Sequence, residues 1–208
     1  MGTRLIGLLA GAMALAASAL GQQRPQPQAI TDITKVDADC AVQGEYVGTI
    51  TENGAAWGDA TGFCQKLSHK TDRQVVLPTE AQWEFACRAG MQTRFFHGDD
   101  EKLLPQYVLF WARTDLPVGQ FKPNAWGLHG MLGNRHEWCA DLYGPYGDNA
   151  QTDPTSPAEG TERVLRGGSF HNSAKFCRCA SRIHYPPAQA DYDFGFHIAV
   201  RAAASDKK

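Results

Sequence analysis

Apolar residues recur at helical spacing in the segment that starts at Trp57. From there to Leu67 they follow one another at intervals of three or four residues, and the polar residues 70–74 end the run. This spacing places the apolar side chains on one side of a helix. The pattern predicts an α-helix that begins near Trp57 and ends before residue 74.

A second helix is marked by its end signals. Thr79 stands at an N-cap position, Gln82 takes the reciprocal position of a capping box, and Gly90 follows as a stop signal. Apolar residues then occupy two edges of this helix, among them Trp83 and Phe85. The sequence therefore predicts a second helix that is largely buried.

The remainder of the chain changes character after Gly90. Short apolar stretches alternate with Gly, Pro, Asn and Asp as far as Arg201, without a third helical pattern. Two helices followed by a long, turn-rich and aromatic-rich region indicate an α+β domain with much irregular structure.

The N-terminus has the pattern of an export signal. A short basic start is followed by the apolar run Leu5–Leu20 and by the small residues Ala17-Ser18-Ala19. The run is shorter than the roughly 20 apolar residues that a membrane span needs. We predict a signal peptide over 1–21 and a secreted or periplasmic protein; the alternative is an uncleaved anchor.

The expected organisation of the chain follows from these signals. Residues 22–53 are a Pro/Gln-rich leader with a possible strand at Glu45–Ile50. Residues 54–202 form the domain and 203–208 a tail. No membrane contact is expected after signal cleavage.

Charge and cysteine content narrow the possible functions. The chain has 20 basic and 22 acidic residues without a basic run, which argues against nucleic acid and anionic membrane as partners. Its six cysteines are an even number, which in an exported protein favours disulfides. No pair has zinc-finger spacing.

Four stretches together resemble the sulfatase-modifying, or formylglycine-generating enzyme, family. They are Leu77-Pro-Thr-Glu-Ala-Gln-Trp-Glu-Phe-Ala-Cys-Arg-Ala-Gly90, Pro123-Asn-Ala-Trp-Gly-Leu-His-Gly-Met-Leu-Gly-Asn-Arg-His-Glu-Trp-Cys139, Arg163-Val-Leu-Arg-Gly-Gly-Ser-Phe170 and Cys177-Arg-Cys-Ala-Ser-Arg182 with Gly195-Phe196. The resemblance implies a C-type-lectin-like fold. True members use copper and molecular oxygen to oxidise a cysteine in a sulfatase Cys-x-Pro-x-Arg motif to formylglycine, while many relatives keep the fold and do something else. The strands that normally precede the first helix are missing or replaced, as in a truncated or recombined member.

The resemblance also implies where catalysis would occur. Active members carry two cysteines three and eight positions after the Ser of Gly-Gly-Ser, which here is Ser169. The second cysteine is present as Cys177, but the first position is Asn172. An amide cannot replace a thiolate as nucleophile or copper ligand. Of the catalytic positions Ser169 and Cys177 remain, and neither oxidase activity nor copper binding is expected.

Disulfide pairings are implied by the same resemblance. Cys87 and Cys179 match family positions that are joined by a bridge; two buried thiols are the alternative. Cys139 and Cys177 often occur together in non-catalytic relatives and are a possible second pair. The remaining cysteines, whose pairing stays open, are Cys40 and Cys64.

Calcium is a second cofactor that the resemblance implies. Its ligands would be the Glu137 side chain, the carbonyls of Gly133 and Arg135, and a side chain at position 130. That position is Gly130, which removes one oxygen and should weaken the site. Glu137 is equally well interpreted as a buried, hydrogen-bonded carboxylate.

A different metal site is possible if the fold is kept. His136 stands where the family commonly has Trp, and His171 lies on the same loop as Cys177. Two imidazoles and a thiolate near the former copper position would suit Zn(II) or Cu(II). Alternatively, both histidines are exposed loop residues, and a Cys139–Cys177 bridge would exclude this site.

Several other residues that match the family pattern are interpreted as structural. The predicted core tryptophans are Trp83, Trp126 and Trp138. Arg166 and Arg182 are expected to form ion pairs or to bind carbonyl groups.

Three functions are compatible with these residues. The favoured one is a binding module for an exported protein or a small ligand, without oxidase activity. The alternatives are an active sulfatase-modifying oxidase and a truncated remnant without activity.

Overall fold

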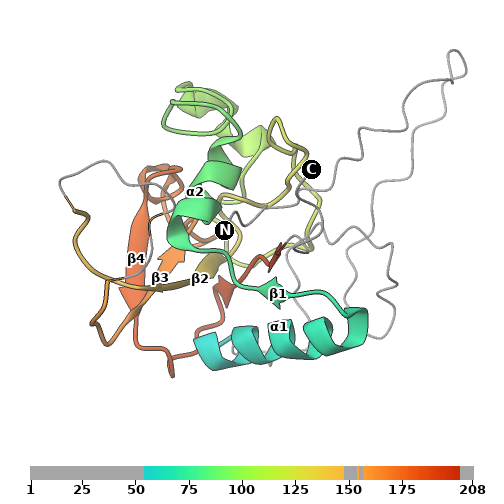
Figure 1. The fold of residues 1–208 in the computed structure, drawn as a ribbon. Helices are drawn as coiled ribbons and strands as arrows, with labels where there is room; N and C mark the ends of the chain where they lie inside the picture. Colours follow the sequence, from blue (N-terminus) through green and yellow to red (C-terminus); the bar gives the residue numbers. More distant parts are fainter. Residues whose placement is uncertain (1–53, 148–153, 155–156, 202–208) are drawn as a thin grey trace, which may run out of the picture.

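The computed structural model describes residues 54–147, 154 and 157–201 (Figure 1). The predicted signal peptide, leader and C-terminal tail lie outside these residues. The helices are α1 (Trp57–Thr71), α2 (Glu80–Arg88), and the short 3₁₀ helices η2 (Glu101–Gln106) and η3 (Ala174–Phe176). The strands are β1 (Val75–Val76), β2 (His136–Leu142), β3 (Arg163–Arg166), β4 (Arg182–Tyr185), β5 (Phe194–Gly195) and β6 (Ala199–Val200). The α+β prediction is confirmed.

Helix α1 begins and ends as the sequence predicts. The Asp59 carboxylate accepts a hydrogen bond from the Ala56 N–H at 3.0 Å and so caps its first turn. Its buried face carries Ala60, Cys64 and Leu67. The helix ends at Asp72, whose φ of 51° takes the chain into the left-handed region.

Helix α2 has the predicted capping box. The Thr79 hydroxyl accepts from the Gln82 N–H, and the Gln82 side chain accepts from the Thr79 N–H. The helix is largely buried, as predicted, but its apolar edge at Phe85 is not. Trp83 is fully buried, whereas Phe85 is 64% exposed. Only one side of the helix packs on the sheet, so Phe85 on the other side faces solvent.

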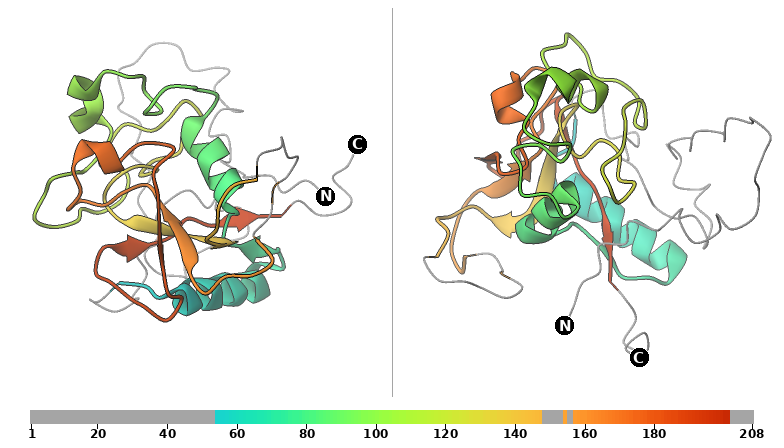
Figure 2. Two further views of the ribbon diagram at one scale, coloured as in Figure 1. Left: turned by 90° about the vertical axis from the view of Figure 1, so that its left-hand side faces the viewer. Right: turned by 90° about the horizontal axis from the view of Figure 1, so that it is seen from above.

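The main sheet has the strand order β4-β3-β2-β5. The first two pairings are antiparallel, and β5 joins β2 in parallel. A register shift in β2 lies between its pairs Trp138–Leu165 and Leu142–Arg163. Figure 2 shows how long irregular segments connect these short strands.

The two faces of this sheet cover two separate hydrophobic clusters. Since side chains alternate along a strand, Trp138 and Leu165 pack with the apolar face of α1. Their neighbours Cys139 and Val164 belong to the cluster beneath α2. Each helix therefore covers one face of the sheet.

Both ends of the described domain are tied to it by backbone hydrogen bonds. Strands β1 and β6 pair antiparallel. Next to them the Arg201 N–H donates to the Gln74 carbonyl at 2.9 Å, and at the other end of α1 the Trp57 N–H donates to the Pro187 carbonyl at 3.1 Å.

Within the described residues, none of the helices is both long and apolar enough to cross a membrane.

Candidate functional site

The Gly-Gly-Ser loop follows directly after β3. At Gly168, φ is +77°, and an added Cβ would lie 2.8 Å from the Cys177 sulfur, so only glycine fits this close approach. Ser169 is fully buried, and its hydroxyl oxygen has no hydrogen-bond partner among the described residues. The loop thus holds a buried, unpaired hydroxyl next to a thiol.

Asn172 closes this loop in the place of the missing cysteine. Its Oδ1 accepts from the Ser169 N–H at 3.1 Å, and its own N–H donates to the Ser169 carbonyl at 3.0 Å. Its carbonyl accepts from the Trp111 N–H at 2.9 Å. The side chain therefore has a structural task that a thiol would not perform in the same way, because sulfur is a weak hydrogen-bond acceptor.

Cys177 is present and lies buried beneath the Gly-Gly-Ser loop. Its sulfur is fully buried, 4.0 Å from the Ser169 carbonyl oxygen. Burial raises the pKa of the Cys177 thiol to about 12. Since the thiolate is the nucleophile and metal ligand, a neutral thiol without a second cysteine does not fit copper.

His136 lies at the start of β2 and is almost fully buried. Its Nδ1 has no partner among the described residues, and a hydrogen bond joins the ring to the Asn172 side chain. Burial lowers the pKa of His136 to about 4, against the opposing effects of the Asp193 charge and this hydrogen bond. The imidazole is neutral at neutral pH.

The predicted metal site of His136, His171 and Cys177 does not form. Among the described residues, no three His, Cys, Asp or Glu side chains are grouped so that they could hold a metal ion. His171 is exposed, and its Nε2 faces the Tyr192 hydroxyl at 2.6 Å instead. The prediction failed because His171 on the loop is exposed, whereas His136 is buried in β2 beside β5.

The calcium prediction also meets an incomplete set of donors. Glu137 is fully buried; one of its oxygens, Oε2, lies 2.5 Å from both Trp83 Nε1 and His197 Nδ1. Its other oxygen is unpartnered within the described part of the chain. With glycine at position 130, that oxygen and the carbonyls of Gly133 and Arg135 leave three ligands where calcium takes six to eight. The residues do not fit calcium, and Glu137 is the buried hydrogen-bonding carboxylate of the alternative interpretation.

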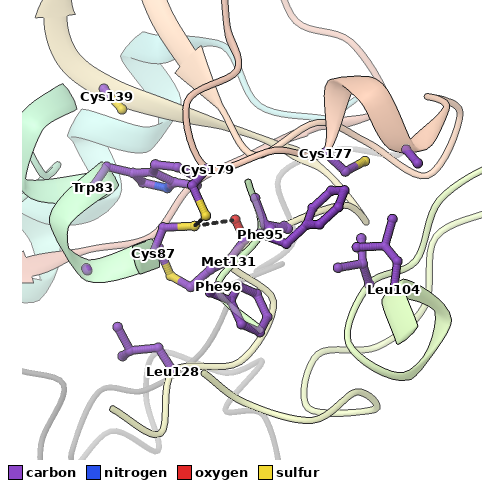
Figure 3. Close-up of a cluster of buried hydrophobic side chains, with 14 of the residues drawn as sticks. Trp83, Cys87, Phe95, Phe96, Leu104, Leu128, Met131, Cys139, Cys177 and Cys179 are labelled. Carbon is purple, nitrogen blue, oxygen red and sulfur yellow. Dashed lines mark hydrogen bonds between the residues drawn. The ribbon is translucent and has the colours of Figure 1, made fainter. Parts of the chain in front are cut away.

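The cysteine positions support one predicted pair better than the other (Figure 3). The sulfurs of Cys87 and Cys179 face each other as thiols 3.6 Å apart. Cys139 and Cys177 lie at opposite sides of the same cluster, with Trp83 and Cys179 between them. The Cys87–Cys179 disulfide stays a prediction, and the structure does not bring the second pair together.

A network of opposite charges links α2 to β3 and β4. The buried Arg166 guanidinium bonds to the Glu84 carboxylate and to the carbonyls of Ser181 and Cys179. Arg182 binds both carboxylate oxygens of Glu80, at 2.8 and 2.7 Å. The predicted structural role of both arginines is confirmed.

Two exposed aromatic residues, Trp111 and Tyr192, contact the loop that contains Asn172. Trp111 is 75% exposed and has a φ of +51°, which non-glycine residues rarely adopt. Tyr192 is 49% exposed and stacks edge-on against Phe170. Trp111 was not predicted, because nothing in the local sequence pattern signals a strained, exposed tryptophan. The prediction that Trp126 lies in the core is wrong, since that ring is 40% exposed beside Phe85.

Comparison with known proteins explains this combination of features. The model of the sulfatase-modifying factor enzyme 1-like domain matches residues 52–202. The chain belongs to the sulfatase-modifying factor family. The formylglycine-generating enzyme of Bos taurus is 32% identical over 165 residues, which cover 70% of this chain and 42% of that enzyme.

Other relatives and structures agree with this membership. The inactive Cα-formylglycine-generating enzyme 2 of Mus musculus is 28% identical over 71% of this chain and 48% of its own length. This chain thus spans less than half the length of either curated relative. Treponema denticola variable protein 1 superimposes with a TM-score of 0.69 at 27% identity, covering 72% of this chain and 70% of its own. PvdO of Pseudomonas aeruginosa, at 24% identity and a TM-score of 0.66 over 72% and 61% of the two chains, shows the same fold.

Proposed function

We propose that this protein is an exported binding module of the sulfatase-modifying factor family that does not oxidise cysteine. The observation that carries the proposal is the state of the catalytic loop. Asn172 replaces one thiol and holds the loop by hydrogen bonds, and the remaining thiol of Cys177 is buried and protonated. The existence of a relative named as inactive is consistent with loss of activity in the family.

The binding surface is the outer side of this loop. Trp111 is joined to it by the hydrogen bond to the Asn172 carbonyl, and Tyr192 by its contact with His171. Large aromatic side chains are enriched where proteins bind partners, because they bury much apolar area with little loss of conformational entropy.

The partner that fits this surface best is a segment of another exported polypeptide. The aromatic rings supply apolar contact, while His171 and the Tyr192 hydroxyl on the same surface supply hydrogen-bonding groups. Strain at Trp111 is consistent with this role, because strained residues persist where function requires them.

A substrate assay tests the absence of oxidase activity. The mature protein is loaded with copper and incubated with a Cys-x-Pro-x-Arg peptide in air, and the peptide is analysed by mass spectrometry. No conversion of the thiol to an aldehyde is expected with the natural sequence. None is expected with Asn172→Cys either, because Cys177 would still be buried and its thiol protonated. Conversion by the unaltered protein would refute the proposal.

Binding is tested by selecting ligands from a random peptide library displayed on phage. Peptides selected on the mature protein should bind Trp111→Ala at least tenfold more weakly, a loss of about 1.4 kcal/mol. Trp126→Ala is the matched control, because it removes another exposed tryptophan outside the surface, and its affinity should not change. Failure to select any peptide, or equal binding by both variants, would contradict a binding role for this surface.

A further inference from the structure

A cavity of about 610 Å³ lies at one end of the β2–β3 pair. The Gly-Gly-Ser loop lies at the opposite end of this pair. The cavity is bounded by α2, by the end of β2 at Leu142, and by Gly144 and Pro157. The Gly-Gly-Ser loop, in contrast, leaves β3 next to Glu137, near the start of β2. The cavity has the size of a small-molecule site and is independent of the surface around Trp111.

Most charged groups that line this cavity already have partners. Glu80 accepts from Arg182 through both carboxylate oxygens and from the Tyr146 hydroxyl at 3.0 Å. Glu84 binds Arg88 at 2.7 Å and also binds Arg166. Each of these two carboxylates and three guanidinium groups is thus paired with an opposite charge, and none is left free to bind a ligand.

Asp141 is the exception in the lining. Its side chain is 7% exposed, and its Oδ2 accepts from the Glu80 N–H at 2.7 Å. Its other carboxylate oxygen has no hydrogen-bond partner among the residues that the structure describes. Burial and the nearby Glu80 charge raise the pKa of Asp141 despite the opposing charges of Arg163 and Arg182. A cation that enters the cavity would therefore meet one carboxylate oxygen that lacks a donor.

The two arginines nearest to Asp141 do not supply that donor. Arg182 directs its guanidinium to Glu80 and to the Gly144 carbonyl, and its charged end is held between the rings of Tyr143 and Tyr146. Arg163 donates to the Ala140 carbonyl and stacks on Trp57. Both side chains are fixed by these contacts.

The rim of the cavity is apolar. Phe85 of α2 lines the cavity and is 64% exposed, and Tyr146 lines it too, with its hydroxyl bonded to Glu80. Further apolar lining comes from Ala81, Leu142, Pro145, Pro154 and Pro157. A ligand that fits has a cationic head for Asp141 and a flat or aliphatic body for this rim.

We propose that this cavity is a second binding site, which takes a small organic ammonium compound. The ammonium group donates to the free carboxylate oxygen of Asp141, and the body packs between Phe85 and Tyr146. A primary ammonium suits the site because it has three donors on a compact charge, and aromatic rings attract cations.

Benzylamine is the probe, and benzyl alcohol is its neutral control of nearly the same shape. Both are titrated into the mature protein at neutral pH, with binding followed by the chemical shifts of the domain. We expect benzylamine to bind at least tenfold more tightly, because the hydrogen bond to a carboxylate is charge-assisted. A third titration with N-acetyl-lysine amide distinguishes a free amine from a lysine side chain as the natural source.

Asp141→Asn tests the site and keeps the hydrogen bond to the first turn of α2, because the amide oxygen can still accept from the Glu80 N–H. This variant should lose about tenfold in benzylamine affinity and bind benzyl alcohol as before. Asp72→Asn, on the exposed end of α1 where asparagine is well accommodated, is the matched control and should bind both probes unchanged.

A second variant keeps the test independent of any change in Asp141 itself. Ala81→Leu should fill the cavity and weaken both probes severalfold with an unchanged melting temperature. Equal affinity for the two probes, no binding of either, or unchanged benzylamine affinity in Asp141→Asn would overturn the proposal. None of these results bears on the peptide surface, which is tested separately through Trp111.

Discussion

Two buried polar clusters lie within a few residues of each other in this protein, and they differ in whether their groups are charged. In the cluster around Arg166, each charge faces an opposite charge, and α2 is fastened by it to β3 and β4. In the cluster around Ser169, the groups are neutral, and the Ser169 hydroxyl and His136 Nδ1 find no partner among the described residues. Unpaired buried polar atoms cost stability and persist mainly where function requires them. Arg166 Nε is also without a partner among the described residues, so the two clusters differ in their charges. The arginine network is ionic and structural, whereas the loop around Ser169 is neutral.

The largest expected effect is in the arginine network. Arg166→Met should lower the free energy of unfolding by about 3–5 kcal/mol, because it leaves the carbonyls of Ser181 and Cys179 and one Glu84 carboxylate oxygen, Oε2, without their donor. Arg94→Met is the control: its ion pair with Asp99 is exposed, so the change should be below about 1 kcal/mol. Urea denaturation measures both, and equal losses would show that the network is not the stabilising cluster.

The second effect is a dependence of the free energy of unfolding on pH, which arises from His136 in the cluster around Ser169. Because the folded pKa of His136 is about 4 and its ordinary value is 6.5, the unfolded chain takes up this proton first as the pH falls. This group therefore does not lower the free energy of unfolding above pH 6.5. Between pH 6.5 and about 4 the free energy of unfolding falls by on the order of 3 kcal/mol.

The variant His136→Gln should lack this part of the acid destabilisation, whereas replacing the exposed His69 of α1 by glutamine should leave it intact. Urea unfolding at a series of pH values compares the three proteins. Parallel curves for the natural protein and His136→Gln would show that this imidazole is not held neutral by burial.

A smaller effect is expected at Asn172. Asn172→Ala removes the acceptor of the Ser169 N–H and the hydrogen bond to His136, so the free energy of unfolding should fall by about 1–2 kcal/mol. Gln65→Ala, at an exposed position of α1, should change it little. If Asn172→Ala were as stable as the natural protein, the loop would not depend on this side chain.

The smallest effect concerns the strain at Trp111. Because glycine adopts positive φ without a steric penalty, Trp111→Gly should be more stable than Trp111→Ala by about 1 kcal/mol. Both should bind selected peptides equally weakly, since both lack the ring. Thermal unfolding checks the first expectation; a less stable glycine variant would mean that the backbone at this position is not strained.

Local signals in the sequence predicted the helices well. The capping box of α2 is formed by residues three positions apart, so Thr79 and Gln82 are sufficient to place it. Which edge of that helix is buried depends on the distant sheet, and the exposure of Phe85 could not be read from spacing alone.

The site was harder to predict than the fold, because its geometry depends on contacts between distant segments. Asn172 and Cys177 were identified through the family pattern. The outward turn of His171 depends on Tyr192, twenty-one positions away. The free carboxylate oxygen of Asp141 depends on how α2 meets the end of β2, which no local motif reports.

The backbone bonds at the two ends of α1 have a consequence for how the domain could be rearranged. The beginning of the described domain is held at one end of this helix and Arg201 next to its other end. Its 15 residues correspond to about 22 Å at 1.5 Å per residue. An extended linker of about seven residues covers that distance, so the domain is suited to circular permutation, with new termini between the exposed residues Glu159 and Gly160.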